Sequence, residues 1–569
     1  MRMLLCLPAA AALCFSAVAC VMAQEVKNQV AARAEFRISG VVVDATTGLA
    51  VPWAELSTTG DVELTTVADS EGRFVFADVE PGKYPLFAAA PGYVKQGYHQ
   101  HGSFFTGIAV GSGLDSEHLL FTLQRQAVIF GRVTDERGDG VRQATVWLFA
   151  ENLNSGQHGV EQRAQMQTND EGGYRFAHLL PGKYYVGVMA RPWYAENGMK
   201  YQSRRQPVEV TSEAGSSTTI QSLSGLPPAD PMFDVVYPVT YFAGATESAG
   251  AVPLVTKAGD AMEADVRLIA VPSTHILLTN VDRRGRSGPN VAVFAVQRPF
   301  GATQVGLTVT SAELSAGTYE VSGLPPGEVR VMVNRGGEEA SDAHGVRVNA
   351  TEGETVDANS REPSANVSGT VTGADGNKAE MQGEVVLRKG SQEAASARVR
   401  RDGTFSFAGV EEGAYQVQLN IPGNHGYVAK VTASGAKVSG KTVSIESASE
   451  VKLVVSMGKG LGRVTGIARM GGKPLEAAMV VLAPAAENLS EADFEDLVRM
   501  DQSDSDGSFA LGGIVPGKYV LMAIEDGWAL EWRDGAVLKP YRQTGIKMEV
   551  TPEEDKNVTV EGVRAEIRE

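Results

Sequence analysis

Histidine and carboxylate residues at metal-ligand spacing occur at two places in the chain. His158 and Glu161 have the separation of a zinc-ligand pair, and His99 and His101 would lie on one face of a strand. No third ligand is identifiable for the second pair, and the first lies in a polar, glycine-containing insertion with no helix to orient it. We therefore predict no metal site at either place and interpret His99–His101 as a solvated loop.

The stretch Asp504-Ser505-Asp506-Gly507 resembles the start of a calcium-binding loop. A full loop would carry an acid two residues earlier, where Gln502 stands, and a glutamate at its twelfth position, where Gly513 stands. We therefore predict a β-turn. Nucleophile-elbow, phosphate-loop and dinucleotide motifs are also missing from any strand-to-helix context, so we expect no catalytic residue, no metal and no cofactor.

Aromatic residues are the remaining candidates for a binding site, because flat rings offer contact area and sugar rings stack on them. Four rings follow predicted strands and are our candidate carbohydrate contacts: Trp193, Tyr194, Trp528 and Trp532. Acids and amides that could bond to hydroxyl groups adjoin them: Glu196, Asn197, Glu531 and Asp534. For any single ring we favour the interpretation that it closes the open end of the domain that carries it over contact with a ligand.

A phrase that recurs five times in the sequence positions these residues. Each copy has a turn glycine, an aromatic residue two positions later and an aliphatic residue seven positions later, and most copies then have Pro-Gly. The turn glycines are Gly72, Gly172, Gly317, Gly403 and Gly507. Apolar residues alternate within each copy, which predicts β-strands with one buried face. Within a copy, the turn glycine and the glycine of Pro-Gly are both expected to lie in tight turns.

Short strands at these intervals, with no amphipathic helix between them, predict an all-β protein made of about five tandem β-sandwich domains. We place a signal peptide at 1–23, a linker at 24–34, and units at 35–125, 126–270, 271–361, 362–457 and 458–569; strands from 222–270 extend the second unit. Trp53 and Trp147 lie inside predicted strands, so we expect them in the core. We expect the units to melt nearly independently and Gly182→Val to damage the second alone, through its turn.

The repeated pattern, GxVxD…DxxGxFxFxxxxPGKYxLxAxxxGY, resembles the carboxypeptidase regulatory-like domain. The resemblance is close in 36–93, 128–194 and 464–528 and looser in 271–361 and 362–457. It implies transthyretin-like, Ig-like β-sandwiches grouped with carbohydrate-binding-like folds, and it implies no peptidase activity. The segment from Tyr237 to Leu268 is similar to tails in large secreted repeat proteins of soil bacteria.

The N-terminal 23 residues have the pattern of a secretory signal with cleavage before Gln24. A lipid anchor on Cys20 is the alternative, which we favour less because Ala17 replaces the usual leucine. All three cysteines lie in this segment, so the mature chain forms no disulfide, and export without disulfides points to a bacterium. No later apolar run approaches the roughly 20 residues of a spanning helix. The net charge of −17 disfavours nucleic acid and anionic lipid as partners.

These observations favour a non-catalytic protein that is secreted, periplasmic or on the bacterial cell surface. We expect it to bind a glycan or a cell-envelope protein, or to act as a structural spacer. The alternatives are an accessory or regulatory component of a peptidase or outer-membrane transport system, and an unrecognised hydrolase. Because repeats occupy nearly the whole chain, little sequence remains for a separate catalytic domain. The carbohydrate prediction rests on analogy of fold.

Overall fold

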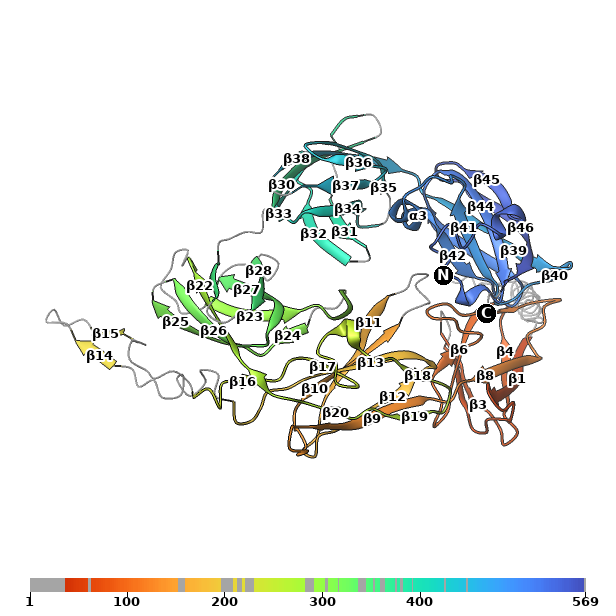
Figure 1. Cartoon of the computed structure of the whole chain (residues 1–569). Coiled ribbons are helices and arrows are strands. Elements are labelled where there is room, and N and C mark those ends of the chain that lie inside the picture. Colours follow the sequence, from red (N-terminus) through yellow and green to blue (C-terminus); the bar gives the residue numbers. More distant parts are fainter. Residues whose placement is uncertain are drawn as a thin grey trace, which may run out of the picture.

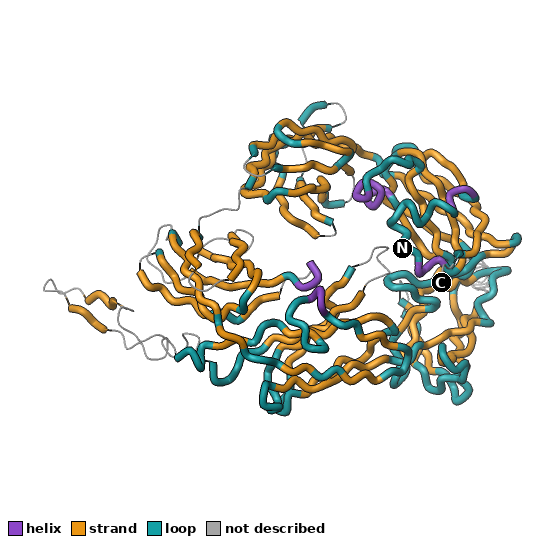
Figure 2. The backbone as a smooth tube through the Cα atoms, viewed as in Figure 1, coloured by secondary structure: helices purple, strands orange, loops and turns teal. Residues whose placement is uncertain are grey.

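The described chain consists almost entirely of β-strands (Figures 1 and 2), which confirms the predicted all-β sandwich fold. A computed structural model describes residues 36–566 except 60–62, 152–158, 196–207, 212–216, 221–229, 282–290, 302–304, 316, 336–343, 351–353, 359–363, 374–375, 379–381, 391, 424–425 and 447–448. The predicted signal peptide, Cys20 and the linker lie outside the described residues, as do His158, Glu196 and Asn197. We keep the term unit for the five predicted ranges; their number and boundaries stay a prediction.

The first unit is built from two sheets whose apolar side chains share one buried cluster. Its strands are β1 (Phe36–Asp44), β2 (Glu55–Thr58), β3 (Thr65–Val67), β4 (Arg73–Val79), β5 (Gly82–Ala89), β6 (Gln96–Gly97), β7 (Gly107–Val110) and β8 (Leu119–Leu123). One sheet has the order β4-β1-β8, and the other has the order β3-β2-β5-β6 with β7 also paired to β5. Ile38 of the first sheet and Leu86 of the second are both fully buried in the shared core.

The second unit repeats this plan and adds short strands from 222–270. Its strands are β9 (Ala127–Thr134), β10 (Thr145–Glu151), β11 (Val160–Gln167), β12 (Gly173–Leu179), β13 (Gly182–Met189), β14 (Val208–Thr211), β15 (Ser217–Ile220), β16 (Val235–Val236), β17 (Thr240–Tyr241), β18 (Leu254–Thr256), β19 (Ala261–Glu263) and β20 (Val266–Arg267). Strand β21 (Val271–Pro272), at the start of the third range, pairs with β16. The sheets are β12-β9-β19, with β20 also on β9, and β11-β10-β13-β17, with β18 also on β13. A short 3-10 helix, η1 (Ser248–Gly250), follows β17.

The third unit forms two four-stranded sheets. Its elements are β22 (Thr274–Thr279), β23 (Val291–Gln297), η2 (Pro299–Gly301), β24 (Val305–Leu307), β25 (Thr310–Ser315), β26 (Thr318–Leu324), β27 (Gly327–Arg335), β28 (His344–Ala350) and β29 (Glu354–Asp357). The sheet orders are β25-β26-β22-β29 and β24-β23-β27-β28.

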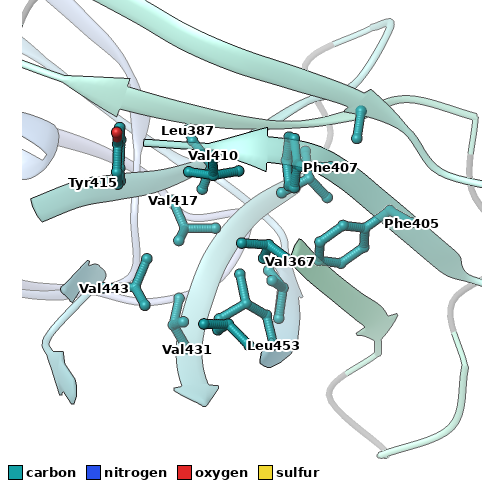
Figure 3. Close-up of a cluster of buried hydrophobic side chains, with 14 of the residues drawn as sticks. Val367, Leu387, Phe405, Phe407, Val410, Tyr415, Val417, Val431, Val443 and Leu453 are labelled. Carbon is teal, nitrogen blue, oxygen red and sulfur yellow. The ribbon is translucent and has the colours of Figure 1, made fainter. Parts of the chain in front are cut away.

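The fourth unit has the same two-sheet construction. Its strands are β30 (Ala365–Thr372), β31 (Glu384–Lys389), β32 (Gln392–Arg398), β33 (Thr404–Val410), β34 (Gly413–Asn420), β35 (Gly426–Ser434), β36 (Lys437–Ser439), β37 (Thr442–Ile445) and β38 (Glu450–Lys459). The sheets are β33-β30-β38-β35 and β32-β31-β34-β37-β36. Figure 3 shows Phe405, Val417 and Leu453 meeting in the core between them.

The fifth unit differs because its last strand joins both halves into one sheet. Its elements are β39 (Gly462–Met470), β40 (Lys473–Pro474), β41 (Met479–Pro484), α3 (Glu491–Leu497), β42 (Arg499–Gln502), β43 (Ser508–Ile514), β44 (Gly517–Glu525), η4 (Gly527–Ala529), η5 (Tyr541–Gln543), β45 (Ile546–Val550) and β46 (Asp555–Arg564). The order is β40-β39-β46-β44-β41-β42, with β43 on β39 and β45 on β44. In every unit the opening strand also pairs in parallel with a late strand, as β1 does with β8 and β39 does with β46.

Helix α3 was not expected from the sequence. The Ser490 hydroxyl caps it by accepting a hydrogen bond from the Asp493 N–H at 3.1 Å, and two acids lie in its first turn. Phe494 is buried against the outer face of β41, so packing stabilises a helix of only seven residues.

The repeated phrase forms a turn and a bulged strand. All five turn glycines have positive φ, between 74° and 83°, as predicted. Six residues after each, a second residue adopts the left-handed conformation, where the register to the opening strand shifts by one. These bulge residues are Asp78, His178, Gly323, Gly409 and Gly513.

Two predictions about individual residues are wrong. Gly182 does not have positive φ, and a Cβ on it would make only ordinary contact, 3.5 Å from the Tyr184 ring. The conformational demand therefore falls on Gly172 and not on Gly182. Trp53 is 63% exposed because it lies in a turn with φ of 60°, whereas Trp147 is buried as expected.

Contacts between neighbouring units arrange the chain in a ring (Figures 1 and 2), so that the first unit lies against the fifth. The second and third units share a buried apolar cluster in which the Phe300 ring lies 5.2 Å from that of Phe149. An ion pair of 2.9 Å joins Arg330 to Glu411 of the fourth unit. The fourth unit reaches the fifth through Lys441, whose backbone N–H donates to Asp493 at 2.9 Å. These joints couple the units, so we no longer expect them to melt independently.

Candidate functional site

Trp193 is the most exposed of the four candidate rings, with 79% of its surface accessible. It lies in the loop that follows β13, where the neighbouring Tyr194 ring meets it edge-on with centroids 5.7 Å apart. The guanidinium carbon of Arg137 lies 5.9 Å from the centroid of the Trp193 ring, within the range of a cation–π contact. The ring is therefore oriented by its neighbours while much of its surface faces solvent.

Glu136 holds the support of this ring in place. One carboxylate oxygen accepts a hydrogen bond from the Tyr194 hydroxyl, and the other accepts one from the Tyr237 hydroxyl at 3.0 Å. The Arg267 guanidinium donates to the Glu136 carbonyl oxygen. Burial and the bond to Glu136 raise the pKa of Tyr194 to about 12, and the same causes raise the pKa of Tyr237. Both hydroxyls therefore stay protonated donors at neutral pH.

The turn between β9 and β10 fixes the position of Arg137. Asp135 is only 3% exposed, and its carboxylate accepts hydrogen bonds of 2.9 Å from the backbone N–H groups of Arg137 and Asp139. Burial alone would raise the pKa of Asp135, but these two donors and the Arg137 charge lower it below its usual value. Asp135 is therefore a charged, structural anchor, and Asp139 beside it is exposed.

The other two tryptophans lie in packed environments. Trp532 is 7% exposed in the apolar cluster with Phe494, and the Arg533 guanidinium carbon lies 4.9 Å from its ring centroid. The Trp528 indole N–H donates to the Ala477 carbonyl at 3.0 Å, and its ring stacks on His101 of the first unit with centroids 4.4 Å apart. One face of Trp528 is thus occupied by the chain itself. Ligand contact by these two rings stays a prediction, to which their packing lends no support.

Two of the three sequence motifs that could have bound metal have other roles, and His158 of the third lies outside the described residues. Within the described residues, no group of three or more His, Cys, Asp and Glu side chains could hold a metal ion. Asp504–Gly507 forms the predicted β-turn, in which the Gly507 N–H donates to the Asp504 carbonyl at 2.8 Å. The loop with His99 and His101 is half-buried against the fifth unit instead of solvated, and this burial lowers the pKa of both imidazoles.

The sequence indicated Trp193 and Tyr194 but missed the residues that support them. Glu136, Arg137 and Tyr237 come from the loop after the opening strand and from the added segment at 222–270. The stretch Thr134-Asp135-Glu136-Arg137-Gly138 does show a turn, but nothing in it shows that the turn faces Trp193. The fold brings them together because β9 and β13 belong to facing sheets of one sandwich.

Solved structures with similarity to this chain include several pilins. A streptococcal ancillary pilin is 13% identical over 51% of this chain and 99% of its own, with a TM-score of 0.18. The pilus protein RrgB of Streptococcus pneumoniae is 9% identical over 78% and 99%, with a TM-score of 0.14. The Bacillus anthracis TIE protein is 10% identical over 93% and 69%, with a TM-score of 0.16. Comparison with curated proteins gave no match.

Family models match three stretches of the sequence. The β-sandwich domain of subunit 7 of the ER membrane protein complex matches residues 374–488, which crosses the predicted boundary at 457. The carboxypeptidase regulatory-like domain matches residues 37–124 and 128–222, which correspond to the β1–β8 sandwich and to most of the second unit. In the described residues, no helix combines the length and the apolar character needed to cross a bilayer. The chain is thus a β-sandwich protein that contains carboxypeptidase regulatory-like domains at residues 37–124 and 128–222.

Proposed function

We propose that the chain is a non-catalytic, exported protein that binds carbohydrate outside the cytoplasm, with Trp193 as the contact ring. The observation that carries this proposal is the Trp193 ring itself, 79% exposed and oriented by Arg137 and Tyr194. Exposing an indole ring to water and fixing its orientation are both unfavourable in free energy. A ring that is nevertheless exposed and fixed is suited to stacking on a ligand.

The charges around Trp193 favour a neutral, hydroxyl-rich ligand over an anionic one. Asp135, Glu136 and Asp139 outnumber Arg137 in the turn below the ring, and the whole chain carries a charge of −17. Carboxylates accept hydrogen bonds from hydroxyl groups, and the exposed Asp139 lies at the edge of this turn. Asp135 and Glu136 already bond within the chain, so Asp139 is the carboxylate that we propose as an acceptor for a sugar hydroxyl.

The test compares two exposed tryptophans on the chain from Gln24 onward. The unmodified chain is screened on a glycan array, and Trp193→Ala and Trp53→Ala are screened beside it. Both rings are exposed, so each substitution should change the free energy of unfolding by about 0.5 kcal/mol or less. We expect Trp193→Ala to lose at least about tenfold in affinity, or about 1.4 kcal/mol, and Trp53→Ala to bind normally.

A third variant separates the ring from its support. Tyr194→Phe keeps the aromatic ring and removes only the hydroxyl that donates to Glu136. We expect it to weaken glycan binding less than Trp193→Ala does, because the Trp193 face is retained. If no glycan binds, or if Trp193→Ala binds as well as the unmodified chain, the proposal is wrong, and a cell-envelope protein or a spacer role takes its place.

The processing of the N-terminal segment on export is tested separately. Labelling cells with a radioactive fatty acid distinguishes cleavage before Gln24 from a lipid anchor on Cys20. We expect no incorporation; incorporation that disappears in Cys20→Ser would establish the anchor. Either result is compatible with binding through Trp193.

A further inference from the structure

The joint between the first and fifth units contains a buried polar side chain that only the opposite unit satisfies. Gln502, at the end of β42, is 3% exposed. Its amide nitrogen donates to the His99 carbonyl at 2.7 Å and to the Thr106 hydroxyl at 2.8 Å, and its amide oxygen accepts from His101 Nδ1 at 3.1 Å. These three bonds all cross the joint, and Thr106 is completely buried. A buried amide satisfied in this way marks specific recognition.

Strand β7 docks on the turn that follows β42 through its backbone. The Gly107 N–H donates to Asp504 Oδ1 at 2.9 Å, and the Gly107 carbonyl accepts from the Ser505 N–H at 3.0 Å. The Ala109 N–H donates to the Ser505 hydroxyl at 2.9 Å. Lys83 adds an ion pair with Asp504 Oδ2 at 2.6 Å. The edge of the first unit is thus covered by the fifth.

At two residues the side-chain position faces the other unit. A Cβ on Gly107 would lie 2.8 Å from Asp504 Oδ1, and the next nearest atoms also belong to Asp504. The polar atoms of Gln502 bond to His99, His101 and Thr106, all in the first unit. We therefore expect substitution at either position to disturb the joint.

We name the two sides of this joint the clasp surfaces. The first-unit surface consists of Lys83, His99, His101, Thr106, Gly107 and Ala109, and the fifth-unit surface consists of Gln502, Ser503, Asp504, Ser505 and Trp528. The two surfaces differ, so they form a heterologous pair. Within one chain the connection through the other units gives them a high effective concentration, which favours closure of the ring.

We propose that the clasp surfaces also bind each other between chains, so that the first unit of one copy recognises the fifth unit of another. The partner is a second copy of this chain, because the fifth-unit surface supplies the donors and acceptors that the first-unit surface needs. A heterologous pair of this kind joins copies head to tail, into a larger ring or an open chain of molecules. Closure within one copy competes with this assembly.

The test uses two variants of the chain from Gln24 onward, each with one damaged clasp surface. Gly107→Asp places a carboxylate against Asp504 and damages the first-unit surface. Gln502→Lys places a cation in the buried joint and removes the amide oxygen that accepts from His101, so it damages the fifth-unit surface. A mixture of the two restores one undamaged pair, between the first unit of the Gln502→Lys chain and the fifth unit of the Gly107→Asp chain.

The mass of each sample is measured by size-exclusion chromatography with light scattering, after circular dichroism confirms folding. We expect each variant alone to have the mass of one chain and the mixture to contain a species of twice that mass. The control mixes the chain that carries both Gly107→Asp and Gln502→Lys with the chain that carries Gly107→Asp alone. This mixture offers no undamaged pair of surfaces, so it should show only the mass of one chain. A mixture of the single variants that shows no two-chain species overturns the proposal, and so does a two-chain species in the control.

Discussion

The need for glycine in the turn of the second unit can be measured by comparing the free energies of unfolding of Gly172→Ala and Gly182→Ala. Gly172 has φ of 83°, and a Cβ on it would lie 2.3 Å from the Val133 carbonyl oxygen. That oxygen belongs to the backbone of the opening strand, so it cannot swing aside. Gly182 lies ten residues further along the phrase, outside the left-handed region, and a Cβ on it would make only ordinary contact, 3.5 Å from the Tyr184 ring.

The left-handed conformation alone costs an alanine about 1–3 kcal/mol. The backbone contact adds to this, so we expect Gly172→Ala to lower the free energy of unfolding of the second unit by at least about 2 kcal/mol. Gly182→Ala meets neither penalty, and the smaller entropy of its unfolded chain stabilises it by up to about 1 kcal/mol.

Hydrogen exchange measured by mass spectrometry on peptides from β9 and β12 reports the opening free energy of this sandwich directly. Such a local probe is needed because a chain of coupled units need not unfold in two states. If Gly182→Ala destabilises these peptides as much as Gly172→Ala does, the assignment of the strained turn to Gly172 is wrong.

Three further predictions concern packing and charge. His275 bonds to Asp234 at 2.6 Å and to Glu320 at 3.0 Å, and the Glu320 bond raises its pKa to about 9, against a desolvation effect of opposite sign. Because the folded pKa lies above the unfolded value of about 6.5, the resulting stability is fully present below pH 6.5 and is lost as pH rises through 9; thermal melts should show this slope, and His275→Asn should remove it. Trp532→Ala should cost about 3–5 kcal/mol in urea unfolding and leave glycan binding unchanged, unless Trp532 is a contact ring. Phe300→Ala should raise proteolytic cleavage between the second and third units, because this ring fills the cluster between them, whereas equal cleavage would mean that the cluster does not hold the joint.

The repeat spacing carried most of the information about the fold. The turn glycines were predicted from their distance to an aromatic and an aliphatic residue, and all five have the expected conformation. The bulge six residues later was visible only in part, because glycine occupies it in three copies while Asp78 and His178 occupy it in the others. Aspartate and histidine adopt this conformation more often than most non-glycine residues, but they are also common elsewhere, so the signal they leave is weak.

Contacts between units were beyond sequence reasoning. Gln502 is an ordinary polar residue in the sequence, and its partners lie about four hundred residues earlier in the chain. His101 and Trp528 were each interpreted locally, as a loop residue and as a binding ring, although they stack on each other. Trp193 was located correctly in a loop, but its relation to Glu136 depends on how two sheets face each other.

The parallel pairing of first and late strands sets an order on the synthesis of this protein. A unit cannot complete its sheet until its late strand has emerged, so β1 waits for β8, and β39 waits for β46. A chain that emerges from its N-terminus would therefore finish its sandwiches one after another. Strand β7 of the first unit would therefore stay uncovered while the second, third and fourth units are synthesised. It would be covered only after Asp555–Arg564 has emerged and completed the sheet of the fifth unit.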